Sequence, residues 1–250
     1  MIRERILAYG TPGSSKSYQW LLTARWQVPK GHRFFILDTD DATERMLAEE
    51  FKDLQGKLNL YRVYNWADYM DAARESVKAA REGDWVVVDL ADDAWKTVQR
   101  FYIEEIFKED PGQYFVQARL ALKQKEESTK KAAKNFQPFR GWVDWPVVNA
   151  LYDDWINPII YRSKAHVYLA TRANRTSIED DTDIKETYGP YGIRPAGQKN
   201  LAHQVHTVFI VNQAKPGQWE ITTVKDRGRK MYSHAPLISL PKQYLAGVMK

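Results

Sequence analysis

The chain has 250 residues, of which 44% are hydrophobic and 28% charged, a composition typical of a globular protein with a buried core. It contains no cysteine, which excludes disulfides, thiolate catalysis and cysteine-ligated zinc. No apolar run approaches the roughly 18–20 residues that cross a bilayer, and the first residues lack a signal-peptide pattern, so we expect a cytoplasmic protein without membrane contact. The net charge of +5 mildly favours a polyanionic partner.

A glycine-containing loop follows the first apolar run of the chain. Residues 10–17 read Gly-Thr-Pro-Gly-Ser-Ser-Lys-Ser, after an apolar run at 6–9 and before a helical stretch at 18–28. This order of strand, loop, Lys-Ser and helix is that of a phosphate-binding loop, in which backbone N–H groups and the helix N-terminus face the phosphates. Lys16 would reach the β- and γ-phosphates, and Ser17 would hold the Mg²⁺ that bridges them. We predict that ATP contacts Gly10, Thr11, Pro12, Gly13, Ser14, Ser15, Lys16, Ser17 and Tyr18.

One position of this loop departs from the usual pattern. Ser15 stands where glycine is expected before the lysine. A Cβ crowds a tight loop, so this residue bears on nucleotide affinity and turnover. The alternative interpretation of the whole segment is an ordinary glycine-containing turn.

Strands and helices alternate through the first 110 residues, which predicts a mostly parallel sheet with helices on both faces. The apolar run Val86-Val87-Val88 has the pattern of a strand that is buried on both faces. We predict an α/β fold in a single domain over residues 1–250. The expected strands are 5–9, 34–37, 58–63, 85–89, 166–171, 206–211 and 219–225, and the expected helices are 17–28, 43–54, 68–82 and 92–107.

Carboxylates follow two of the predicted strands. Asp89 ends the strand 85–89, where a magnesium-binding Walker B aspartate belongs. The strand 34–37 runs into Asp38, Asp40 and Asp41 at the carboxyl edge of the sheet, where ligands of open α/β sheets bind. One of these three could polarise an attacking water, whereas we expect Asp41 to cap the next helix. Helix capping is also the alternative role for Asp89.

Residues 113–145 combine basic and aromatic residues, with seven lysines or arginines against three acids. Such a segment suits single-stranded nucleic acid, because rings stack on bases while cations follow the phosphates. The alternative is an amphipathic helical pair whose aromatic residues belong to the core. A polar stretch at 172–200 has the length of a functional loop, and the tail 233–250 is expected to be peripheral. The candidate DNA-binding residues of the two segments are Lys130, Lys131, Lys134, Arg172, Arg175, Arg194 and Lys199.

The order of these motifs resembles the ATPase core of the RecA/RadA recombinase family, in the compact form that bacteriophages encode for single-strand annealing or recombination. Residues 38–42, Asp-Thr-Asp-Asp-Ala, are similar to the family's Asp-Ala-Glu-His-Ala motif, which places Asp40 at the water-activating glutamate. The strand 86–89 matches the family's apolar strand that ends in Asp89. The strand 167–171 resembles the next core strand, with Thr171 or Arg172 in place of the γ-phosphate-sensing glutamine. The loop after that strand contacts DNA in RecA and corresponds to 172–200.

The closing motif of the resemblance lies at residues 223–229. RecA-like proteins carry a Val-Lys-Asn-Lys or Val-Lys-Asn-Arg segment whose cations reach ATP on the neighbouring subunit, and here Lys225 and Arg227 stand at the matching positions. Read alone, such a segment is a solvated turn. The resemblance covers residues 5–230 except 113–145. It implies a DNA-stimulated, Mg²⁺-dependent ATPase that forms a homo-oligomer with ATP between subunits, in the host cytoplasm if a phage encodes it.

The resemblance also leaves choices open. Because Met1 almost abuts the first strand, we expect a ring or short oligomer rather than a RecA-like filament. Single-stranded DNA is the expected ligand and a single-strand binding protein a further partner. A helicase loader or packaging ATPase is a second reading, since Asp92 or Asp93 could complete an acidic pair after the Walker B strand. A small-molecule kinase is a third, although it should have an arginine-rich lid.

Overall fold

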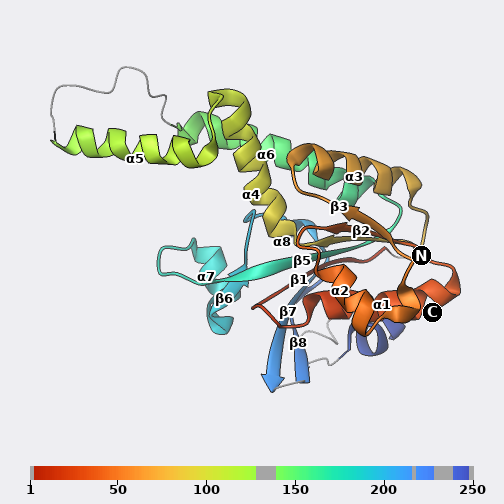
Figure 1. Ribbon diagram of the computed structural model, residues 1–250. Coiled ribbons are helices and arrows are strands. Elements are labelled where there is room, and N and C mark those ends of the chain that lie inside the picture. Colours follow the sequence, from red (N-terminus) through yellow and green to blue (C-terminus); the bar gives the residue numbers. More distant parts are fainter. Residues whose placement is uncertain (1–2, 128–138, 216–217, 228–238, 248–250) are drawn as a thin grey trace.

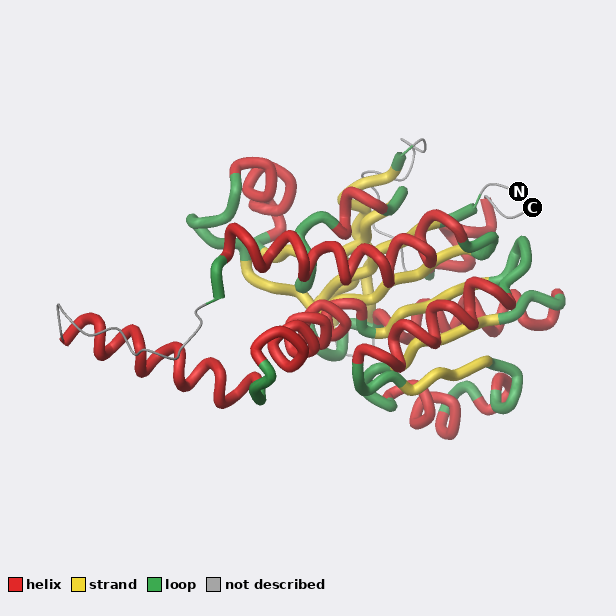
Figure 2. The backbone as a smooth tube through the Cα atoms, turned by 90° about the horizontal axis from the view of Figure 1, so that it is seen from above, coloured by secondary structure: helices red, strands yellow, loops and turns green. Residues whose placement is uncertain are grey.

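The computed structural model describes residues 3–127, 139–215, 218–227 and 239–247. Its centre is an eight-stranded, mostly parallel sheet with helices on both faces (Figures 1 and 2). The predicted α/β class is therefore confirmed. The strands run in the order β3-β2-β4-β5-β1-β7-β8, and β6 pairs with β5.

Seven of the eight described strands lie where the sequence predicts them, with ends that differ by a few residues, and β6 is a strand that the sequence does not indicate. β1, β2 and β4 are buried almost throughout, as the apolar runs indicate, and β7 and β8 form an antiparallel hairpin at one side. The strand β5 lies between β1 and β4, which brings its carboxyl end between the two candidate motifs. The bounds are β1 Arg5–Gly10, β2 Phe34–Asp38, β3 Asn59–Arg62, β4 Trp85–Asp89, β5 His166–Arg175, β6 Ile193–Pro195, β7 Thr207–Lys215 and β8 Gln218–Asp226.

The helices follow local signals of the sequence. α3 begins after Asn65, which accepts a hydrogen bond from Asp68 N while the Asp68 carboxylate accepts from Asn65 N, a reciprocal cap that satisfies free N–H groups. The π-helical turns Ile103–Phe107 and Pro158–Arg162 extend α4 and α6. The bounds are α1 Lys16–Gln27, α2 Ala42–Glu49, α3 Trp66–Ala79, α4 Ala91–Tyr102, α5 Pro111–Glu127, α6 Gly141–Asn157, α7 Thr182–Tyr188 and α8 Leu201–Gln204.

Each face of the sheet has its own hydrophobic core, because side chains alternate along the strands. In β1, Leu7 and Tyr9 pack under α3, α4 and α6, whereas Ile6 and Ala8 pack under α1. Burial of apolar surface on both faces is the main source of stability in such a fold. It also holds the carboxyl ends of β1, β2, β4 and β5 together at one edge.

Three expectations about irregular segments are wrong. The stretch 172–200 contains the end of β5, α7 and β6, and Figure 1 shows α7 and β6 beyond the end of β5. The helix α6 begins at Gly141, so Pro146 lies inside it rather than before it. The tail is not peripheral where it is described, because apolar residues of the segment 240–245 are buried against α1 and β7. Single-sequence patterns miss this packing because the partners are distant in the chain.

Candidate functional site

The glycine-containing loop joins β1 to α1 at the carboxyl edge of the sheet. A Cβ at Gly10 would clash with the carbonyl of Val211, so only glycine fits there. Gly13 has a φ of 75° and Ser15 a φ of 71°, both in the left-handed region. A serine in this region costs roughly 1–2 kcal/mol relative to glycine. Ser15 therefore adopts the backbone conformation that the usual glycine would provide.

Lys16 is folded over the loop that precedes it. Its Nζ donates hydrogen bonds to the carbonyl oxygens of Gly10 and Thr11, each at 3.0 Å, and to Ser14 Oγ at 3.2 Å. The side chain is only 8% exposed, and burial lowers the pKa of the ammonium while Asp89 opposes that shift. Lys16 is thus a buried residue with several hydrogen bonds rather than an exposed loop lysine.

Ser17 and Asp89 lie together, as the sequence predicts for a magnesium site. The Asp89 carboxylate is hydrogen-bonded to the Ser17 side chain and accepts a second bond from Trp20 Nε1 at 2.9 Å. Asp89 is 3% exposed, and burial raises its pKa. Mg²⁺ prefers a few protein oxygens completed by phosphate and water, and a hydroxyl beside one carboxylate fits that preference. Within the described ranges, no three His, Cys, Asp or Glu residues gather into a larger cage.

The three aspartates after β2 have different surroundings. Asp40 is exposed, and its Oδ1 accepts a hydrogen bond from Ala42 N at 3.2 Å. Asp41 occupies the N-cap position of α2, as expected, but its side chain makes no capping hydrogen bond. Asp41 instead contacts Arg62 and Tyr64. The Asp40 charge nevertheless raises the pKa of Asp89, which places Asp40 near the loop. Asp38 is buried, and burial raises its pKa to about 6.

Two contacts that the sequence does not reveal hold this edge together. Thr39 N donates to Asp89 O at 2.9 Å and Leu90 N donates to Thr39 Oγ1 at 2.9 Å, which joins the ends of β2 and β4. From β5, the buried Tyr168 hydroxyl donates to Lys16 O at 2.8 Å. These pairs depend on which strands are neighbours, which no local motif specifies.

Thr171 and Arg172 lie within β5, between the loop and Asp89. Thr171 is fully buried, and its Oγ1 has no hydrogen-bond partner among the described residues. Arg172 donates to Asp92 Oδ2 at 2.8 Å and to Asp93 Oδ1 at 2.6 Å, and these carboxylates raise its pKa. It also lowers the pKa of Lys16, so Arg172 belongs to this edge rather than to a free DNA-binding loop.

The other candidate DNA-binding residues do not form one cluster of unpaired cations. Arg194 forms an ion pair with Asp180 at 3.1 Å, and Lys199 forms one with Asp181 at 3.1 Å. Arg175 is exposed at the end of β5. Lys130, Lys131 and Lys134 lie outside the described residues.

The segment 113–145 agrees in part with each of its two interpretations, a segment that binds nucleic acid and an amphipathic helical pair. α5 extends away from the body of the protein (Figures 1 and 2). Tyr114 is 2% exposed, as the core interpretation requires, whereas Trp145 stacks on Trp95 at 6.0 Å and is 40% exposed. Phe115 and Trp142 are 62% and 93% exposed, as stacking on bases requires. The aromatic residues therefore divide between the core and the surface.

Lys225 and Arg227 lie at the amino edge of the sheet, opposite the loop, because β8 runs antiparallel to β7. Lys225 Nζ donates to Ala202 O at 2.6 Å and to Val205 O at 2.9 Å. Burial, and to a lesser extent Arg227, lowers the Lys225 pKa to about 8. Arg227 is exposed. Neither cation can reach the loop of its own chain.

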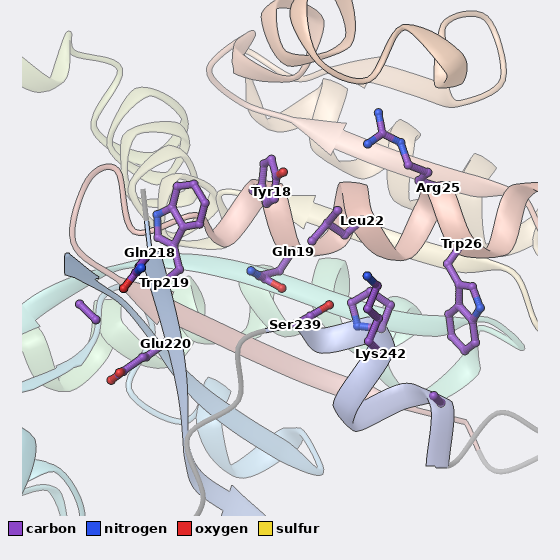
Figure 3. A pocket seen from close by; sticks show the side chains of 13 residues that line it. Tyr18, Gln19, Leu22, Arg25, Trp26, Gln218, Trp219, Glu220, Ser239 and Lys242 are labelled. Carbon is purple, nitrogen blue, oxygen red and sulfur yellow. The ribbon is translucent and has the colours of Figure 1, made fainter. Parts of the chain in front are cut away.

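A cavity of about 970 Å³ lies beside the loop, between α1, β8 and the tail (Figure 3). The Tyr18 and Trp219 rings stack at 5.4 Å, and Trp219 Nε1 donates to Gly13 O at 3.3 Å. Figure 3 shows Leu22 and Trp26 of α1 further along the cavity, and Lys242 of the tail beside Leu22. The sequence indicates only Tyr18 of this set, because Trp219 and Lys242 are brought in by the fold.

Comparison with known proteins identifies no relative. No family model matches the chain, and no curated protein matches it either. Among the described helices, none combines the length and the apolar character that crossing a membrane requires.

Proposed function

We propose that this chain is a RecA-like ATPase that binds and hydrolyses ATP with Mg²⁺ and acts on single-stranded DNA in phage-type recombination, annealing or replication. The observation that carries the proposal is the meeting of Lys16, Ser17 and Asp89 at one edge of the sheet. An ammonium, a hydroxyl and a carboxylate at the end of a glycine-containing loop are the groups that hold a nucleotide triphosphate and its metal ion.

The nucleotide would lie along the loop and the cavity. Lys16 would exchange its carbonyl partners for phosphate oxygens, and the N–H groups at the start of α1 would add hydrogen bonds. Ser17 and Asp89 would hold Mg²⁺, which when bound neutralises charge that develops on the phosphates. The stacked rings of Tyr18 and Trp219 offer a flat apolar wall for the base.

Hydrolysis needs groups that act in the transition state. Asp40 would orient the attacking water, and Thr171 and Arg172 would contact the γ-phosphate from β5. Lys225 and Arg227 would neutralise charge on ATP bound to a neighbouring subunit, as arginine fingers do, which makes activity depend on a homo-oligomer. Their position at the opposite edge supports this arrangement, because it leaves a neighbour's nucleotide as the one within reach.

Single-stranded DNA is the proposed polymer ligand. The support is the segment 113–145, with Lys130, Lys131 and Lys134, and the exposed rings of Phe115 and Trp142. A single-strand binding protein is a proposed partner. The helicase-loader reading required Asp92 or Asp93 as a free acidic group, and both are engaged with Arg172. That engagement favours the first proposal.

The test is ATP hydrolysis with and without single-stranded DNA. Lys16→Ala should abolish turnover, Asp89→Asn should weaken Mg²⁺-dependent ATP binding, and Asp40→Asn should slow hydrolysis while sparing binding. The matched control for Asp40→Asn is Asp71→Asn, an exposed carboxylate on α3 that should change neither. Wild-type turnover in Lys16→Ala would refute the ATPase proposal. Turnover that single-stranded DNA leaves unchanged would refute the DNA proposal and favour a small-molecule kinase.

A further inference from the structure

Three basic residues form a row across adjacent strands at the amino edge of the sheet. His206 N donates to Arg5 O, and Arg227 N donates to His206 O, each at 3.0 Å. These bonds align the start of β1, the residue before β7 and the residue after β8. Because neighbouring strands lie about 4.8 Å apart, the row spans roughly 10 Å. Arg3 and Lys225 lie two residues from Arg5 and Arg227, and both lower the pKa of His206, which places them near the row.

These cations lie close enough together that they lower one another's pKa. Burial is the largest cause that lowers the pKa of His206, and the neighbouring cations are the next. Arg227 also lowers the pKa of Arg5 and of Lys225. No carboxylate appears among the charges that shift these three groups. Like charges held together oppose folding, so such a cluster suits an anionic ligand.

Arg5 is the member of the cluster that is least used by its own chain. Arg3 donates to Ile160 O, and Lys225 donates to two backbone carbonyls. Arg5 Nε has no hydrogen-bond partner among the described residues, and the guanidinium lies over the Tyr161 ring, 5.2 Å from its centroid. Tyr161 is 50% exposed, so this pair lies at the surface. A cation–π contact positions the guanidinium without consuming its hydrogen bonds.

The opposite edge of the same sheet carries the complementary charge. Asp40 is exposed there, Asp38 and Asp89 are buried beside it, and Arg172 is already paired with two carboxylates. A bound triphosphate would make that edge more negative. Arg5 cannot meet the anions of its own chain, because Gly10 lies five residue steps along β1 from it, about 16 Å away. Opposite charges at opposite edges of one molecule fit a head-to-tail contact between two copies.

We propose that the amino edge docks on the loop edge of a second copy, and that Arg5, positioned by Tyr161, is a further cation that acts with Lys225 and Arg227 on the phosphates bound there. This inference rests on the proposed ATPase function. It adds a residue from the start of the chain, outside every motif of the sequence, to the set that acts across the subunit boundary.

The test combines Arg5→Gln with complementation by a loop mutant. Arg5→Gln should hydrolyse ATP at least about tenfold more slowly while its affinity for a fluorescent ATP analogue stays within twofold, because a transition-state cation acts mainly on turnover. Mixing it with Lys16→Ala should restore activity, since each variant retains what the other lacks. Arg5→Lys should keep part of the rate. The matched control is Arg74→Gln, which removes the same charge from the exposed face of α3.

Sedimentation velocity at low and moderate salt supplies a readout besides activity. Arg5→Gln should associate more weakly than wild type and show a smaller salt dependence of association. Wild-type turnover and association in Arg5→Gln would overturn the inference, and so would slow turnover that Lys16→Ala does not restore. If Arg227→Ala complements Lys16→Ala and Arg5→Gln does not, the inference fails and the proposed function stands. If wild type itself does not hydrolyse ATP, the proposed function fails.

Discussion

Replacing Trp20 by phenylalanine should weaken the fold through a single buried carboxylate. Trp20 is 1% exposed on α1, and its Nε1 donates to Asp89 Oδ2 at 2.9 Å. Phenylalanine keeps an aromatic ring in the core but removes the donor. Asp89 would then retain Ser17 as its remaining side-chain donor in a site where burial already raises its pKa.

The expected loss follows from two terms. A hydrogen bond to a charged group contributes about 1.5–3 kcal/mol, and the smaller ring leaves a space worth about 1 kcal/mol. Trp20→Phe should therefore lower the free energy of unfolding by about 2–4 kcal/mol. For a domain of this size each kcal/mol lowers the Tm by about 2–4 °C, so the Tm should fall by roughly 4–16 °C.

Urea unfolding of four proteins separates the two terms. In a double-mutant cycle with Asp89→Asn, the coupling free energy between positions 20 and 89 should be about 1.5 kcal/mol or more, whereas the cavity term cancels. The loss in free energy of unfolding caused by Trp20→Phe should also become smaller as the pH falls, because removal of the donor disfavours only the charged form of Asp89. Trp26→Phe, in the same helix, is the matched control and should cost less than about 1 kcal/mol. Coupling near zero would refute the assigned role of Trp20.

Two further predictions concern the loop and the end of β2. Ser15→Gly should raise the free energy of unfolding by about 0.5–1 kcal/mol. It removes the strain of a positive φ, about 1–2 kcal/mol, but the greater freedom of glycine in the unfolded chain offsets about 0.5–1 kcal/mol of that gain. A lower urea midpoint or weaker ATP binding would show that the Ser15 side chain makes a needed contact. Burial raises the pKa of Asp38 to about 6, so its favourable contribution is complete below about pH 4 and is lost as the pH rises through 6. Asp38→Asn should remove about 3 kcal/mol of that pH dependence between pH 4 and 7. An unchanged pH profile of stability would show that Asp38 titrates normally.

Local features of the sequence were sufficient to predict the sheet and the loop. The period of apolar residues located β1, β2, β4 and β5, since buried parallel strands are apolar on both faces. The expected helix 68–82 corresponds to α3, which begins two residues earlier, directly after its cap Asn65. The motif at 10–17 identified Lys16 and Ser17 as candidate site residues. The position of Asp89 at the end of an apolar strand identified it as a third. Each of these signals lies within a few residues of the chain, which is why it can be read without the fold.

Contacts between distant segments were decided only by the tertiary structure. Trp20 meets Asp89 and Tyr168 meets Lys16 because the strand order places β4 and β5 beside the loop. Asp41 is the N-cap residue of α2, but its side chain contacts Arg62 from β3 instead of capping the helix, and Asp40 accepts the hydrogen bond from Ala42 N. Packing of α4 beside β5 brought Asp92 and Asp93 to Arg172, and the pairing of neighbouring strands aligned Arg5 with His206 and Arg227. Such pairs join residues tens to hundreds of positions apart, and packing of the two cores rather than any local propensity brings them together.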